Sequence, residues 1–130
     1  MDVTREITLP LEPEAAWDAV VDLERWLTED GALLLEPGAE GELTLRDGET
    51  RRATVQDVRP GELLSFWWHA PDALATLVEV RLVGIDDGTR VVVVESGYAG
   101  APVCHADVLA GPGWGPALLR LRGAGELVPA

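Results

Sequence analysis

The sequence predicts an α+β domain in which a curved antiparallel sheet is covered by a C-terminal helix. After one strand and two helices, the middle of the chain holds about six apolar segments separated by Gly- and Pro-containing turns. Strands that are grouped together, without helices between them, favour an antiparallel sheet. Residues 113–122 then form a short apolar helix, which is not stable alone and needs a surface to pack against. One face of the sheet supplies that surface.

The first part of the chain is predicted to form a strand and two helices. Apolar residues share one parity through residues 3–11, with Arg5 as the exception, which is typical of a strand. Pro13 stands near the first position of a helix that extends to Asp22, followed by an apolar stripe at helical spacing. A second short helix, residues 23–28, carries Trp26.

The strand-rich middle is predicted to contain segments 32–36, 42–46, 50–58, 63–69, 75–83 and 90–96. Asp47-Gly48 is typical of a hairpin turn. Glu79 and Arg81 mark one face of segment 75–83 as exposed to solvent, which leaves Thr76, Val78, Val80 and Leu82 on the other face. In the last strand, Val91, Val93 and Glu95 share one face.

The C-terminal helix has an apolar stripe formed by Trp114, Leu118 and Leu121. Arg120 and Arg122 lie off this stripe. Pro116 fits a first helical turn, and Gly123 and Gly125 are stop signals. Together these residues predict a shortened or interrupted helix that fills the interior of the sheet.

The composition limits the class of partner. The chain has 130 residues, a single-domain length, so we expect one domain over residues 1–130. Its net charge of -13 disfavours nucleic acid and anionic membrane surfaces, which need Lys and Arg. The single cysteine excludes an internal disulfide. No signal-peptide pattern or apolar run of membrane-spanning length is present, so we expect a cytoplasmic protein.

Four groups of residues, in this order and spacing, resemble the helix-grip superfamily, which is START-like and also called SRPBCC. They are residues 13–17 with Trp26, residues 58–67, residues 88–91, and Trp114 with Leu118 and Leu121. The most similar branch is the bacterial homologues of the activator of the heat-shock chaperone ATPase. The resemblance covers nearly the whole chain. It implies a seven-stranded antiparallel sheet wrapped around a long C-terminal helix, with a cavity between them.

Across the superfamily, the resemblance implies, this cavity holds hydrophobic small molecules, and a few members are cyclases or hydrolases. The chain departs from the family pattern in two places. Gly and Pro residues at 111–116 interrupt the start of the last helix, and Glu95 stands where the family often has His. Both differences touch the cavity, so a ligand cannot be carried over from relatives.

Glu95 is the leading candidate for a catalytic group. A carboxylate on the inner face could act as a general acid or base after burial. The alternative is a position at the strand end, near water or paired with an Arg. Arg51 and Gln56 are polar strand residues on opposite faces, and one of them is a candidate to enter the cavity.

Trp67 and Trp68 are adjacent strand residues, so only one of them faces the cavity. Family spacing favours Leu63, Ser65 and Trp67 as the inner set, where Ser65 would leave room for a ligand. The opposite choice places Trp68 inside with Leu64 and Phe66.

The two histidines, His69 and His105, are weaker candidates. Cys104 and His105 stand next to each other but lack the paired spacing of a zinc site, so no metal is predicted. No phosphate loop, nucleophile elbow or other cofactor motif is present, and no cofactor is predicted.

The predicted function is binding of a hydrophobic or aromatic small molecule in an apolar cavity with a few polar groups. The predicted ligand-binding residues are Trp26, Ser65, Trp67, Val78, Val93, Glu95, Trp114 and Leu118. One alternative is a chaperone- or stress-related interaction protein, with a protein partner or a homodimer. The other is an enzyme of the polyketide cyclase or hydrolase kind that uses Glu95 or His69.

Overall fold

A single antiparallel sheet of seven strands and three helices make up the computed structural model, which describes residues 2–46, 48–71, 73–97 and 114–126. The strand order is β1-β7-β6-β5-β4-β3-β2. The elements are β1 (Asp2–Leu9), α1 (Pro13–Val21), α2 (Leu23–Trp26), β2 (Thr28–Ala32), β3 (Glu40–Leu45), β4 (Thr50–Arg59), β5 (Leu63–His69), β6 (Thr76–Ile85), β7 (Gly88–Gly97) and α4 (Trp114–Glu126). The predicted α+β class and the two short helices after the first strand are confirmed.

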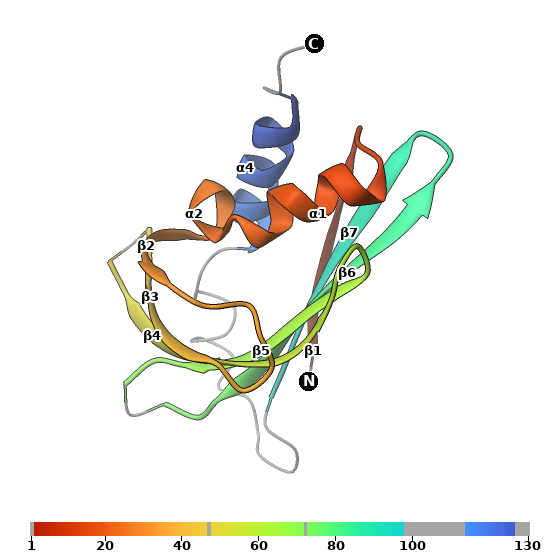
Figure 1. Ribbon diagram of the computed structural model, residues 1–130. Helices are drawn as coiled ribbons and strands as arrows, with labels where there is room; N and C mark the ends of the chain where they lie inside the picture. Colours follow the sequence, from red (N-terminus) through yellow and green to blue (C-terminus); the bar gives the residue numbers. More distant parts are fainter. Residues whose placement is uncertain (1, 47, 72, 98–113, 127–130) are drawn as a thin grey trace.

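The three helices lie together on one side of the curled sheet, with α1 and α2 next to α4 (Figure 1). Helix α4 contacts α1, α2 and the edge strand β1. Arg120 on α4 donates from Nε to the carbonyl oxygen of Trp26 at 3.0 Å, which ties α4 to the end of α2. Partial burial and the nearby charge of Arg46 lower the pKa of the Arg120 guanidinium.

The inner face of the sheet is apolar, as the alternation predicted for β6 and β7. Its buried side chains include Leu43, Leu45, Ala53, Val55, Leu64, Phe66, Trp68, Val78, Val80, Leu82, Val91 and Val93. On the outer face, Glu79 and Arg81 form an ion pair at 2.8 Å. Removing the inner set from water supplies the main driving force for folding.

Two glycines occupy positions that no other residue fits. Gly31 in β2 has a φ of +116°, and a Cβ there would collide with the carbonyl oxygen of Glu42 on β3. Gly88 at the start of β7 has a φ of +152°, and a Cβ would collide with the carbonyl oxygen of Leu9 on β1. The pairings of both edge strands, β2 with β3 and β1 with β7, therefore include a close backbone contact that only glycine permits.

Two predictions about helix ends are wrong. Helix α4 continues through Gly123 and Gly125 to Glu126, because a glycine weakens a helix without forcing it to end. Helix α2 ends at Trp26, and Thr28 already pairs with Leu45 as the first residue of β2. The interruption predicted at residues 111–116 is wrong for Gly115 and Pro116, because α4 runs through both, and Pro116 lies in the first turn, where its missing N–H is not needed. Residues 111–113 lie outside the described residues.

Candidate functional site

Glu95 on β7 is buried, with 1% of its surface exposed. Oε2 accepts hydrogen bonds from Trp68 Nε1 at 2.8 Å and from Thr76 Oγ1 at 2.6 Å. Oε1 accepts a hydrogen bond from Trp114 Nε1 at 2.9 Å. Three donors from three different elements therefore converge on one buried acid.

Arg51 supplies the positive charge that accompanies this acid. Its Nη1 lies 3.8 Å from Glu95 Oε2, and its side chain is 7% exposed. Its Nε donates to Glu49 Oε1 at 2.9 Å, and its guanidinium carbon lies 4.6 Å from the ring centroid of Trp68. An unpaired charge in such a place would be strongly unfavourable, so Glu95 and Arg51 depend on one another.

The two indoles that bond the acid pack against two further aromatic side chains, and we call Trp26, Phe66, Trp68 and Trp114 the aromatic cluster. Trp68 and Trp114 stack with centroids 5.6 Å apart, and Trp26 lies 6.2 Å from Trp114. Phe66 meets Trp68 edge to face at 5.4 Å. The indole of Trp26 is anchored separately, because its Nε1 donates to the carbonyl oxygen of Val20 at 3.1 Å.

Strand register explains why these groups meet. Trp68 on β5 pairs with Thr76 on β6, and Val78 on β6 pairs with Glu95 on β7. Thr76 and Val78 are two residues apart and share a face, so Trp68 and Glu95 both lie on the inner side, on the two strands that flank β6. Helix α4 begins at Trp114 and adds its indole from above the sheet.

The predicted orientation of β5 is wrong. The inner set is Leu64, Phe66 and Trp68, so Ser65 and Trp67 lie on the opposite face of the strand, where Ser65 is itself buried with 1% of its surface exposed. Trp67 is half-buried on the outer face, where its Nε1 donates to Gln56 Oε1 at 2.7 Å. The alternation of apolar residues along β5 favoured the observed orientation. The spacing of the family motif favoured the opposite one, with Trp67 inside.

The other residues singled out in the sequence have three different outcomes. Trp26, Val78, Val93, Glu95, Trp114 and Leu118 are all buried in the interior. His69 has the outward parity of Trp67, is half-buried, and lies with Nδ1 3.0 Å from the carbonyl oxygen of Ala70, so it is not part of the Glu95 site. Cys104 and His105 lie outside the described residues.

Three partners of Glu95 were not among the predicted ligand-binding residues: Arg51, Trp68 and Thr76. Each carried a usable signal in the sequence. Arg51 shares its parity with Ala53 and Val55, which are buried. Thr76 begins the inner set of β6, and Trp68 continues the apolar parity of β5.

Within the described part of the chain, no group of three or more His, Cys, Asp or Glu side chains is placed to hold a metal ion. In the same residues, no helix combines the length and apolar character that crossing a membrane requires. The chemistry of the Glu95 site is that of a buried acceptor bound to indole and hydroxyl donors.

A seven-stranded antiparallel sheet that encloses a C-terminal helix defines the helix-grip class, the SRPBCC or START-like proteins. Residues 10–126 match the model of one family within that class. The chain belongs to the family described as Activator of Hsp90 ATPase homolog 1-like protein.

Several solved structures share the fold. Protein MLL2253 from Mesorhizobium loti superposes with a TM-score of 0.86 at 21% identity, with all of both chains covered. The Aha1 dimer from Colwellia psychrerythraea gives 0.78 at 18% identity, covering 100% of this chain and 99% of that one. DynU16, described as a protein in the dynemicin biosynthetic locus, gives 0.82 at 24% identity over 97% of this chain. This chain spans only 47% of DynU16. No curated protein sequence matches the chain significantly.

Proposed function

We propose that this protein binds a hydrophobic or aromatic small molecule between the inner face of the sheet and α4. The observation that carries the proposal is the buried Glu95 carboxylate, held by two indole N–H groups inside the aromatic cluster. Binding sites for small molecules are mostly apolar, with a small number of placed polar groups. The aromatic cluster supplies the apolar part, and Glu95, Arg51 and Thr76 supply the polar part.

The charges around the cluster favour an uncharged ligand. The two carboxylates of Glu49 and Glu95 flank the single guanidinium of Arg51. An anionic ligand would therefore enter a region that already holds more negative than positive charge. A neutral aromatic compound can contact the aromatic cluster without adding charge to these pairs.

The contacts of Glu95 favour a role in binding over one in proton transfer. Its oxygens already accept three hydrogen bonds, and its charge is paired with Arg51. A general base needs a free position toward the proton that it removes.

A fluorescence titration with the neutral probe N-phenyl-1-naphthylamine tests the proposal. We expect saturable one-to-one binding, weakened about fivefold by Trp68→Phe, since an aromatic contact contributes about 1 kcal/mol. The matched variant Trp67→Phe changes an indole on the outer face and is expected to leave the affinity unchanged. Absence of saturable binding, or equal weakening by both variants, would overturn the proposal.

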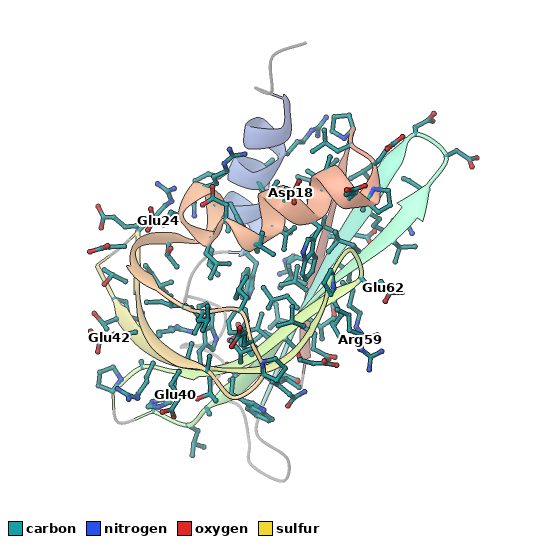
Figure 2. All side chains as sticks on the ribbon, in the orientation of Figure 1. Asp18, Glu24, Glu40, Glu42, Arg59 and Glu62 are labelled. Carbon is teal, nitrogen blue, oxygen red and sulfur yellow. The ribbon has the colours of Figure 1, made fainter. Side chains whose placement is uncertain are left out.

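A protein partner is the second candidate, favoured by the acidic surface and net charge of -13. Asp18, Glu24, Glu40, Glu42 and Glu62 are exposed and distributed around the molecule (Figure 2). Such a surface suits a basic partner, and the association would weaken steeply with salt. Calorimetric titration with a heat-shock chaperone at low and high salt tests it, and an absence of binding at low salt would reject it.

A further inference from the structure

Arg46 and Arg120 come from distant parts of the chain and meet at the end of α2. Arg46 follows β3 and donates from Nη2 to the carbonyl oxygens of Glu24 and Arg25, at 2.9 and 3.4 Å. Arg120 donates from Nε to the next carbonyl oxygen, that of Trp26, at 3.0 Å. Three successive carbonyls therefore hold two guanidinium groups in neighbouring positions, where α2 lies beside α4 (Figure 1). We call Arg46 and Arg120 the arginine pair.

No acid neutralises the arginine pair within the part of the chain that the structure describes. Neither guanidinium forms an ion pair with a carboxylate there, although the chain has 23 acidic residues and only ten basic ones. A backbone carbonyl accepts a hydrogen bond but has no net charge, so two full positive charges remain. Other arginines do pair with an acid, namely Arg25, Arg51, Arg59, Arg81 and Arg90.

The two positive charges are close enough to affect one another. Partial burial and the charge of Arg46 both lower the pKa of the Arg120 guanidinium, which shows that each charge is unfavourable for the other. A negative group placed between them would replace this repulsion by two attractions. The arrangement is therefore that of an anion site, and the carbonyl contacts alone do not explain it.

The arginine pair also has hydrogen-bond donors to spare. A guanidinium has five N–H donors, and the carbonyl contacts use Nη2 of Arg46 and Nε of Arg120. The other nitrogens have no partner among the described residues. Arg46 is exposed and Arg120 is half-buried, so a solute can reach these donors from water.

Charge and shape together define the class of anion. The planar fork of a guanidinium matches the oxygens of a phosphate group, and two forks balance its roughly two negative charges at neutral pH. The net charge of -13 repels a long polyanion, which leaves a small one. We propose that the arginine pair binds the phosphate group of inorganic phosphate or of a small phosphate ester.

NMR spectra of the arginine Nε–H groups, recorded near neutral pH at fixed ionic strength, test this proposal. The probes are inorganic phosphate and methyl phosphate, and acetate is the control with a single negative charge. We expect saturable shifts of the Arg46 and Arg120 signals, with acetate binding about tenfold more weakly. Binding of inorganic phosphate alone would identify the free ion as the ligand, and binding of methyl phosphate would extend the site to phosphate esters.

Three variants locate the interaction. Arg46→Gln is expected to weaken phosphate binding about tenfold, through the loss of a charged hydrogen bond. Arg46→Lys keeps the charge without the fork and is expected to recover part of the affinity. Arg52→Gln is the matched control, because it removes an exposed arginine from the outer face of β4 and changes the net charge equally. It is expected to leave the affinity unchanged.

Stability gives a second measurement of the same site. Phosphate is expected to raise the unfolding temperature of the parent and of Arg52→Gln, and to have little effect on Arg46→Gln. Absence of saturable shifts, equal weakening by Arg46→Gln and Arg52→Gln, or equal affinities for acetate and phosphate would overturn the proposal. The readout does not involve N-phenyl-1-naphthylamine or the aromatic cluster, so either proposal can fail without the other.

Discussion

Trp67 and Trp68 are neighbours in the chain and lie on opposite sides of the sheet. Trp68 is fully buried, stacks on Trp114, and donates to the charged Glu95 at 2.8 Å. Trp67 is half-buried and donates to the neutral amide oxygen of Gln56 at 2.7 Å. The two indole hydrogen bonds have nearly the same length, and their surroundings differ in charge and in access to water.

This difference indicates that the surroundings of a hydrogen bond decide its value. A bond to a buried charge is worth about 1.5–3 kcal/mol, and one between neutral groups is worth about 1 kcal/mol. Removing a partner on the inner face also leaves other buried groups unsatisfied, whereas water can replace a partner on the outer face. The inner side of β5 is therefore expected to be much more sensitive to substitution than the outer side.

Glu95→Ala is expected to cause the largest loss of stability. It removes the acceptor for three donors and leaves the Arg51 guanidinium without its interior partner. Breaking a buried ion pair from one side costs about 3–5 kcal/mol, which is the expected decrease in the free energy of unfolding. Urea denaturation followed by fluorescence measures it.

Glu79→Ala is the matched control, because Glu79 pairs with Arg81 on the outer face. A surface pair of this kind is worth at most about 1 kcal/mol. Similar losses in the two variants would contradict the proposed difference between the faces.

Trp68→Phe is expected to lower the free energy of unfolding by about 3 kcal/mol, from a lost charged hydrogen bond and a partly unfilled space. The substitution keeps an aromatic ring against Trp114 and removes the donor to Glu95. Thermal and urea unfolding measure the change. A loss below that of Trp67→Phe would reverse the expected difference between the two faces of β5.

Thr76→Val is expected to have a smaller effect, about 1.5 kcal/mol, because one of the three donors to Glu95 is replaced by a methyl group of similar shape. Thr76 is half-buried, so water can partly replace its hydroxyl. A double-mutant cycle with Glu95→Gln isolates the bond between the two side chains. A coupling energy near zero would show that the 2.6 Å contact contributes nothing to stability.

The sequence was sufficient for most of the architecture because the apolar pattern repeats along most strands. The exception is β2, whose residues lack that pattern, so the strand predicted at residues 32–36 lies instead at Thr28–Ala32. Alternation placed Val91, Val93 and Glu95 on one face, and all three are buried. Helical spacing placed Trp114, Leu118 and Leu121 on one stripe, and these are buried as well. The spacing of apolar residues within one segment shows which side chains share a face, and reading it needs no knowledge of the neighbouring strands.

The partners of Glu95 were harder to predict because they depend on register. Arg51 is distant from Glu95 in the chain, and its strand contains an irregularity between Val55 and Asp57 that shifts the pairing. Parity indicates that Arg51 faces inward, but it does not indicate which residue of another strand the guanidinium meets.

Trp67→Phe is expected to have the smallest effect, a loss of less than about 1 kcal/mol in the free energy of unfolding. The phenyl ring keeps most of the contact with the outer face, and only the hydrogen bond to Gln56 is removed. Water can bond to the freed amide oxygen, because Gln56 is exposed. Urea unfolding of Trp67→Phe, Trp68→Phe and the double variant measures both sides of the sheet at once. We expect the two losses to add, since the indoles face away from one another, and marked non-additivity would show that the two faces of β5 are coupled.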